Sequence, residues 1–241
     1  MEKTKQKNII GINNCLGFPI GISINNCCAH WTISSKLDDI VFKENDLVKI
    51  DFGINNKGFI VDSALTIATN KANDLHEQLN NASQEALYSA IKMARPDTII
   101  SEIGTQTHEI IESYGFNPVN ALCGHKIMPF KIHADKVIPN IRFNFYNKRI
   151  EENEIYAIEP FVSNKSGNSY MSENENTHYC VNYNTSKEKK ISILDGLNTD
   201  TIELYNIIDT NFKTLPFCDN WLNFKYDSGK LHNKLDILVK S

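Results

Sequence analysis

Residues 47–66, LVKIDFGINNKGFIVDSALT, form the stretch that decides the fold. Two apolar runs rich in β-branched residues flank the segment Asn-Asn-Lys-Gly, and this pattern predicts a β-hairpin. With the turn centred on Asn56 and Lys57, Asp51 and Asp62 face each other across the two strands. Their Cβ atoms would then lie about 5 Å apart on the same face of the hairpin.

This aspartate pair poses an electrostatic problem. Like charges directly opposite each other destabilise a strand pair, and the apolar neighbours of Asp51 and Asp62 offer poor solvation. A shared proton, a basic partner, or one or two metal ions would neutralise them. A register slip that exposes one aspartate is the other interpretation, so the pair alone leaves both readings open.

The composition is that of a globular protein with one sizeable core or two small ones. The chain has 241 residues, of which 41% are hydrophobic and 22% charged, with a formal net charge of −4. The net negative charge does not favour DNA binding, and the sequence has no basic stripe that would indicate it. No stretch reaches the length of a membrane span, and Asn13, Asn14, Gly17 and Pro19 interrupt the apolar run near the start. We therefore expect no signal peptide and a cytoplasmic protein.

The six cysteines show no C-x-x-C pair. This pattern predicts free, buried thiols in a reducing compartment. The neighbours Cys27 and Cys28 are interpreted as two core thiols on a strand, with a soft-metal or redox site as the alternative.

Apolar periodicity predicts two consecutive helices after residue 70. The first stops at Arg95-Pro96, and the second is capped by Asp97 or Thr98 and closes at Tyr114-Gly115. The apolar face of the first helix consists of Leu75, Leu79, Ala82, Ala86, Ala90 and Ile91.

Strands and further helices are expected on either side of this helical pair. A strand starting at residue 16 should enter a loop that ends at His30, and short strands are expected within 119–139, 155–162 and 176–182. Helical spacing returns at 199–212 and again at 231–239.

Two histidines and one glutamate stand out as candidate site residues. His125 and His133 are eight residues apart with Pro129 between them, which favours a strand and a loop and indicates metal binding or acid–base chemistry. Glu159 interrupts an otherwise apolar run, and a buried carboxylate requires a cation or a hydrogen-bond donor.

Other polar residues have sequence contexts that are typical of ordinary structural roles. His30, beside Trp31, is on its own most simply a packed and hydrogen-bonded residue, and His108 is predicted to be solvated on its helix. The acids at positions 151, 152 and 154 are interpreted as turn charges.

The ordered set Asp51, Asp62, His125 and Glu159 resembles that of the dinuclear metallopeptidases of the pita-bread fold, and locally that of type 2 methionine aminopeptidases. The segments that carry this resemblance cover most of the chain from about residue 9. They are FPIGISINNCCAH (18–30), KIDFG (49–53), IVDSA (60–64), GH (124–125), IHA (132–134), EIYAIE (154–159), THY (177–179) and LPFCDNWL (215–222).

The resemblance implies an α+β fold in which a curved, mostly antiparallel sheet carries helices on its outer face. Residues 1–241 are then a single metallopeptidase-like domain, with 183–241 forming part of a helical insertion. Compared with the family, the chain is expected to be shortened at both ends, lacking the N-terminal helices and the C-terminal strand.

The resemblance also implies a ligand set and a reaction. Asp51, Asp62, His125 and Glu159 would bind divalent ions from among Co, Mn, Fe and Zn. The family binds two ions per chain, and one ion is the alternative here. A metal-activated hydroxide would remove the N-terminal methionine of nascent peptides. Glu159 would carry the proton to the leaving amine, and His133 would stabilise the oxyanion.

The remaining roles that the resemblance implies concern the substrate. His30 would contact the peptide beyond the scissile bond, and His133 would also contact the substrate. Phe18, Ile132 and His178 would line an apolar pocket for the methionine thioether.

One departure from the family pattern leaves an alternative open. The family has a second bridging glutamate on a strand near its C-terminus, and no later acid in this sequence has that setting. Two divalent ions bring four positive charges, whereas Asp51, Asp62 and Glu159 together supply three negative charges. Weaker binding of a second metal is therefore expected. The alternative function is a catalytically impaired pita-bread protein that binds ribosomes or other proteins.

Overall fold

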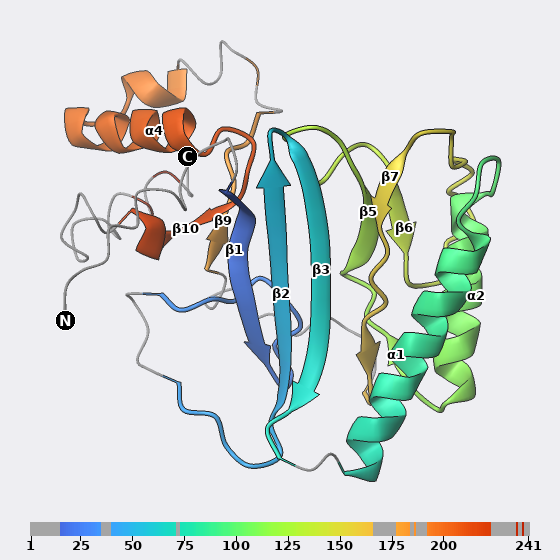
Figure 1. The fold of residues 1–241 in the computed structure, drawn as a ribbon. Helices are drawn as coiled ribbons and strands as arrows, with labels where there is room; N and C mark the ends of the chain where they lie inside the picture. The colour runs from blue at the N-terminus through green and yellow to red at the C-terminus, as the bar shows by residue number, and fades with distance from the viewer. Residues whose placement is uncertain are drawn as a thin grey trace.

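The structure is a computed structural model. It describes residues 15–34, 40–70, 73–165, 177–183, 186, 192–222, 235 and 238 (Figure 1).

The N-terminal half of the fold is a three-stranded antiparallel sheet in the order β1-β2-β3. Its strands are β1 (Cys15–Ile24), β2 (Leu47–Asn56) and β3 (Phe59–Ala68). Figure 1 shows β2 and β3 as the long hairpin that the sequence predicts, with β1 alongside β2. The hairpin prediction is therefore confirmed.

A second group of strands follows the helices α1 (Asp74–Met93) and α2 (Ile100–Ser113). The strand β5 lies between β6 and β7 in one sheet, while β4 pairs with β8 and β9 with β10. These strands are β4 (Asn117–Pro118), β5 (Cys123–Ile127), β6 (Val137–Pro139), β7 (Ile155–Ala157), β8 (Val162–Ser163), β9 (His178–Tyr179) and β10 (Phe217–Cys218).

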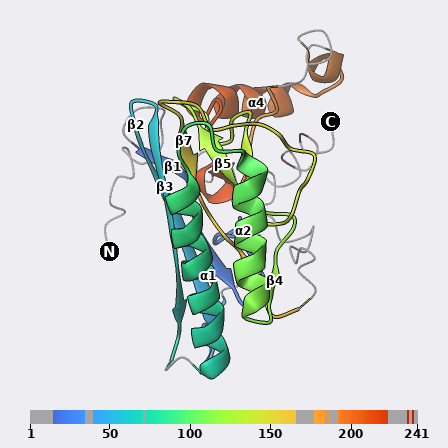
Figure 2. The same cartoon turned by 90° about the vertical axis from the view of Figure 1, so that its right-hand side faces the viewer.

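The fold is layered, and the sheet of β5, β6 and β7 lies between the hairpin sheet and the pair of helices. Figures 1 and 2 show α1 and α2 side by side on the far side of β5–β7 from β1–β3. One cluster of buried side chains, including Ala90, Ile100 and Ile138, joins both helices to these strands. The observed antiparallel sheets with helices on one face match the expected α+β architecture.

The register of the hairpin differs from the sequence prediction. Asp62 pairs with Gly53 and Asp51 pairs with Ala64, so the two aspartates are diagonal neighbours rather than direct partners. The shift is two residues, and because side chains alternate with period two, both carboxylates still lie on the same face. The predicted direct opposition was wrong, whereas the predicted shared face is confirmed.

The turn residues explain the shift. Asn56 pairs with Phe59, which leaves Lys57 and Gly58 as the central turn residues, with φ of 52° and 98°. Two positive φ values define a type I′ turn, whose twist matches that of the flanking strands. The Asn55 side chain supports it, since its Oδ1 accepts a 2.8 Å hydrogen bond from the Gly58 N–H.

The first predicted helix is confirmed as α1, with two exceptions on its apolar face. Ala82, Ala86 and Ala90 are buried, but Leu75 and Ile91 are exposed. Ile91 follows Ala82 by nine residues, which places it about half a turn away from the alanine stripe.

The cap predicted for the second helix was wrong. The residue before α2 is Ile99, which makes no side-chain cap, and the Ile100 N–H instead donates to the Lys148 carbonyl at 2.9 Å. Thr98 serves the preceding helix, because its hydroxyl donates to the Met93 carbonyl at 2.8 Å. The predicted end is confirmed, with Gly115 at φ 77° after the last turn.

The C-terminal region contains α4 (Thr199–Asn211) and the short 3₁₀ helix η1 (Asp219–Trp221). The helix predicted at 199–212 is thus confirmed, and the one predicted at 231–239 lies outside the described residues apart from Leu235 and Leu238. Leu235 packs into a cluster with Leu204, Ile208, Phe212, Phe217 and Leu222. The assignment of 183–241 as a helical insertion of a single domain stays a prediction.

Two smaller predictions concern membranes and thiols. Within the described residues, no helix has both the length and the apolar character needed to cross a bilayer. None of the six cysteines forms a disulfide, as expected, but only Cys218 is buried, so the prediction of buried thiols was wrong for the other five. Cys27 and Cys28 follow the turn after β1 and are only half-buried, so their placement on a core strand was wrong.

The turn geometry leads to a stability prediction. A Cβ added at Gly58 would lie 2.6 Å from the Phe130 ring, whereas one at Gly115, also at positive φ, would meet nothing within 4 Å. We expect Gly115→Ala to lower the free energy of unfolding by about 1 kcal/mol through backbone strain alone. Gly58→Ala should cost about 1–3 kcal/mol more because the ring must move. Urea unfolding of both variants measures this, and equal losses would contradict the predicted contact.

Candidate metal centre

Three predicted ligands converge in the space between the two main sheets. Asp62 comes from β3, His125 from β5, and Glu159 from the segment two residues after β7. The His125 Nε2 atom lies 3.1 Å from Glu159 Oε1 and 3.5 Å from Asp62 Oδ2. One ligand atom from each side chain lies within 4.8 Å of the other two, a spacing that suits one cation.

The strands around His125 hold it in place. It pairs with Val137 of β6 on one side and with Ala157 of β7 on the other. Gly124, next to it, permits a close approach, because a Cβ there would lie 2.5 Å from the Ala157 carbonyl oxygen. The local sequence Gly-His thus serves two purposes, tight strand packing and a side chain directed at the acids.

Glu159 is fixed through its backbone. The side-chain amide of Asn140, a buried residue, donates 3.0 Å hydrogen bonds to the carbonyls of Glu159 and Leu122. The residue therefore lies in an ordered segment although it is outside the strand. The expectation that the carboxylate needs a nearby donor or cation is met by a different group, His125, whose Nε2 lies 3.1 Å from Glu159 Oε1.

Asp51 lies outside this three-residue cluster but is electrostatically coupled to it. Burial, together with the charges of Asp62 and Glu159, raises the pKa of Asp51 to about 7. Its Oδ1 atom is buried and has no hydrogen-bond partner among the described residues. A buried, unsatisfied carboxylate oxygen that faces further carboxylates is an observation that a bound cation would explain.

His125 carries the compensating charge of the cluster. Burial by itself would lower the pKa of His125, but hydrogen bonds to Asp62 and Glu159 and their charges raise it to about 9. Burial is also the main cause that raises the pKa of Glu159. The carboxylate and imidazole donors form a mixed O and N ligand set that fits Mn, Fe, Co or Zn.

The other predicted histidines surround the cluster and are held neutral. The His133 ring meets His125 edge to face, with 4.3 Å between the ring centroids. Burial, followed by the charges of His125 and His30, lowers the pKa of His133 to about 4. The His178 Nε2 donates to the Pro19 carbonyl at 3.0 Å, and mainly burial lowers the pKa of His178 to about 4.

His30 also takes part in this group of rings. Its ring centroid lies 5.9 Å from that of His178, and burial is the main cause that lowers its pKa. The backbone of His30 has φ 58°, an uncommon conformation for a residue with a side chain. The interpretation of His30 as a packed and hydrogen-bonded residue agrees with this burial and with the Thr177 N–H, which donates to the His30 carbonyl at 3.4 Å. A role of His30 toward the substrate stays a prediction.

The apolar residues predicted to line a pocket belong to one buried cluster. Phe18 from β1 and Ile132 from the loop after β5 pack with Ile60, Ile127 and Leu215. The Phe18 ring occupies the space above Gly53, where a Cβ would lie 2.3 Å from it. The structure thus places Phe18 and Ile132 together, and the Pro19 carbonyl links this cluster to His178.

Sequence reasoning missed the role of Glu154. The sequence indicated a turn charge, but its side chain is only 7% exposed and lies 2.8 Å from both Lys126 Nζ and Lys136 Nζ. Tyr156 and the Glu151 N–H each add a 2.8 Å hydrogen bond to Oε2. The signal that could have found it is strand alternation extended to the residue before β7, which puts Glu154 and Tyr156 on the same side of the chain.

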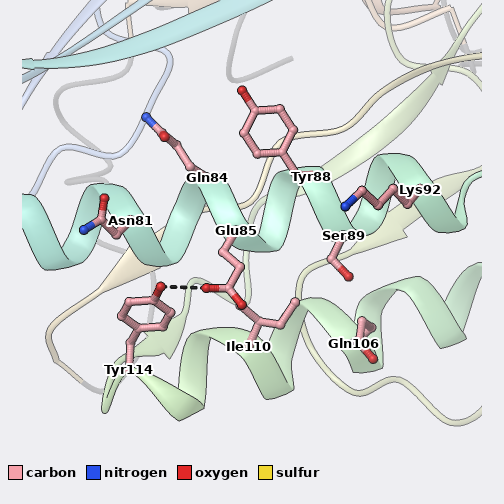
Figure 3. Close-up of a pocket in the computed structure, with 9 residues that line it drawn as sticks. All are labelled: Asn81, Gln84, Glu85, Tyr88, Ser89, Lys92, Gln106, Ile110 and Tyr114. Atoms are coloured by element: carbon pink, nitrogen blue, oxygen red, sulfur yellow. Dashed lines mark hydrogen bonds between the residues drawn. The ribbon is translucent and has the colours of Figure 1, made fainter.

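A separate depression lies on the helical face (Figure 3). Its lining comes from α1, α2 and the residue that follows α2, and it includes the 2.6 Å hydrogen bond from the Tyr114 hydroxyl to Glu85. None of the predicted site residues lines it. We assign it no part in the metal centre.

Comparison with known proteins defines the class of this chain. The family model described as metallopeptidase family M24 matches residues 1–182. The chain belongs to this family, which implies binding of divalent metal and agrees with the cluster of Asp62, His125 and Glu159.

Within this class, the chain is similar to proteins named methionine aminopeptidase 2. It is 34% identical over 241 residues to that of Komagataella phaffii, covering 96% of this chain and 51% of the relative. It is 36% identical over 235 residues to methionine aminopeptidase 2A of Arabidopsis thaliana, covering 92% of this chain and 50% of the relative. The chain thus spans about half the length of the curated relatives it matches.

Solved structures agree on the fold. The methionine aminopeptidase of Thermotoga maritima superposes with a TM-score of 0.59 at 28% identity, covering 65% of this chain and 61% of that one. A structure of a thermophilic Arx1 superposes with a TM-score of 0.73 at 15% identity, covering 99% of this chain and 68% of that one. The second likeness concerns the fold alone.

The metal-centre geometry predicts the effect of removing one ligand. Asp62→Asn replaces a carboxylate by a neutral amide of the same shape, so Co²⁺ affinity measured by calorimetry should fall by about 10-fold or more. Asp46→Asn is the matched control, because Asp46 is a buried carboxylate with partners at Asn25 and Lys43. An unchanged affinity in Asp62→Asn would exclude this residue as a ligand.

The ion pairs of Glu154 with Lys126 and Lys136 predict a pH-dependent difference in stability. Burial would raise the pKa of Glu154, but Lys126 and Lys136 lower it from 4.5 to about 2. Since the folded value is the lower one, its stabilisation is present above pH 4.5 and is lost as the pH falls toward 2. Glu154→Gln should be about 3 kcal/mol less stable than wild type at pH 7. This difference should shrink between pH 4.5 and pH 3 in urea titrations, and a constant difference would contradict the assigned pairing.

Proposed function

We propose that this chain carries the catalytic site of a methionyl aminopeptidase that removes the N-terminal methionine of nascent peptides. The observation that carries the proposal is the convergence of Asp62, His125 and Glu159 on one another, in a chain of family M24. The identity to proteins named methionine aminopeptidase 2 supports the choice of substrate.

The metal-binding residues in this proposal are Asp51, Asp62, His125 and Glu159. Asp51 contributes the buried oxygen that lacks a protein partner, and the other three form the close cluster. We propose Co, Mn, Fe or Zn as the metal, because all accept carboxylate and imidazole donors. When bound, divalent ions supply Lewis acidity that polarises the scissile carbonyl and lowers the pKa of water.

The chain's own residues handle protons and charge. Glu159 is the group proposed to take a proton from the attacking water and deliver it to the leaving amine, and burial raises its pKa toward the range that suits a proton shuttle. His133 is proposed to donate an N–H to the oxygen that becomes negative. Its lowered pKa keeps the ring neutral, so one nitrogen carries the proton that the oxyanion needs.

Substrate recognition is proposed to use both the apolar cluster and the remaining histidines. Phe18 and Ile132 present apolar and aromatic surface suited to a thioether, and His178 lies next to them through the Pro19 carbonyl. His30 and His133 are proposed to contact the peptide. The proposal is supported by the ring of His133, whose centroid lies 4.3 Å from that of His125, and by the ring of His30, which lies 5.9 Å from that of His178.

Catalysis is better supported than the alternative of a ribosome-binding or protein-binding module. The predicted ligands are present, and the relatives at 34–36% identity are named as aminopeptidases. The free cysteines are consistent with work in the cytoplasm, where a nascent N-terminus is accessible.

Methionine release from a Met-Ala-Ser peptide tests the function. We expect metal-dependent turnover by wild type and a loss of about 100-fold or more in kcat for Glu159→Gln, since its amide cannot carry a proton. Asp46→Asn, at a buried carboxylate on the far end of β2, should retain turnover. Absence of turnover by the metal-loaded wild type, or full activity of Glu159→Gln, would refute the proposal.

A further inference from the structure

The structure contains a second buried charge cluster directly behind the metal centre. Its members are Glu154, Lys126 and Lys136, which we call the Glu154 network. Lys126 follows His125 on β5, so the two side chains project from opposite faces of the strand. His125 faces Asp62 and Glu159, whereas Lys126 reaches Glu154 at 2.8 Å.

The network ties together the chain segments that carry the proposed active residues. Lys126 is adjacent to His125, and Lys136 ends the loop that contains His133. Glu154 directly precedes β7, the strand that leads to Glu159. A single carboxylate therefore joins all three segments through its lysine partners.

Backbone contacts make this joint rigid. The Lys126 N–H donates to the Lys136 carbonyl, and the Ala134 N–H donates to the Lys126 carbonyl, both at 2.9 Å. The Lys136 ammonium also donates to the Arg149 carbonyl at 2.8 Å and to Glu151 Oε1 at 2.7 Å. The loop that carries His133 is thus held against β5 at its end by main-chain bonds and by the buried ammonium.

The burial of this network shows that it is not a solvated surface pair. The side chain of Glu154 is 7% exposed and that of Lys136 is 8% exposed. Exposed ion pairs fix little geometry, whereas a buried carboxylate that accepts from two ammonium groups, a phenol and an amide has one favourable arrangement. Removing one partner leaves an uncompensated buried charge.

We propose that Glu154 is a positioning residue that fixes His125, His133 and Glu159 relative to one another, and that it acts through Lys126 and Lys136. The inference rests on the proposed function in that it takes these residues as the active ones. It goes beyond that function by assigning a role to groups that touch neither metal nor substrate.

The test compares Glu154→Gln with the control Asp46→Asn, which removes the charge of another buried, hydrogen-bonded carboxylate remote in sequence from β5 and β7. In metal-free protein, the imidazole NMR resonances of His125 and His133 should shift or broaden in Glu154→Gln. Co²⁺ affinity measured by calorimetry should fall by about 10-fold or more. Asp46→Asn should leave the imidazole resonances and the Co²⁺ affinity unchanged, even if its melting temperature falls as much as that of Glu154→Gln.

Two further variants keep the inference testable. Glu154→Asp retains the charge and should recover part of the Co²⁺ affinity. Lys126→Met removes one partner of the Glu154 carboxylate and serves as the test variant if Glu154→Gln does not fold. It should show the same changes in imidazole resonances and Co²⁺ affinity to a smaller degree.

The inference is overturned if folded Glu154→Gln, or Lys126→Met in its place, keeps the wild-type imidazole resonances and a Co²⁺ affinity within about twofold of wild type. Equal changes in Asp46→Asn would overturn it as well, since they would reflect general destabilisation. Neither readout uses peptide hydrolysis, so a failure of methionine release in wild type would refute the proposed function separately.

Discussion

The structure depends on the burial of several carboxylates at one place. Burial, together with the charges of Asp62 and Glu159, raises the pKa of Asp51 to about 7, and His125 is the cation that partly offsets these acids. Such an arrangement is costly unless a cation compensates it, because these carboxylates are partly withdrawn from water. The fold brings these groups together from separate strands, which explains why the hairpin sheet and β5–β7 face each other.

Each side of this arrangement is supported by a different kind of interaction. The hairpin is fixed by its type I′ turn at Lys57 and Gly58, while β5 is fixed by pairing on both edges and by the close approach at Gly124. Behind β5, the buried carboxylate of Glu154 lies between two lysine ammonium groups. Two charge clusters therefore lie on opposite faces of β5. One is the acid-rich cluster of Asp62, His125 and Glu159, which suits a metal, and the other is the Glu154 network, in which lysines offset the carboxylate.

Membership of family M24 and the similarity to proteins named methionine aminopeptidase 2 agree with this physical reading. The excess of acid over base in the cluster and the orphaned Asp51 oxygen are what a metalloprotein is expected to show. The neutral histidines beside it, His133 and His178, add hydrogen-bonding groups without adding charge.

Local sequence patterns predicted those elements whose stability is local. The alanine stripe of α1, the proline after it and the apolar runs of β2 and β3 each have one favourable local structure. Errors arose where a non-local partner decided the outcome. Thr98 was expected to cap α2 but closes α1, because the Lys148 carbonyl already accepts from the Ile100 N–H.

By itself, the sequence determined the hairpin and the helices of the described residues. The acids in apolar runs and the Gly-His motif singled out candidate residues, and the resemblance to a known family supplied their proposed roles as ligands. Only the tertiary structure decided the hairpin register, the position of Asp51 outside the closest cluster and the burial of Glu154. The reason is physical. The charge that a buried side chain tolerates depends on neighbours from distant segments, here Lys126 and Lys136 for Glu154, and no local pattern specifies those neighbours.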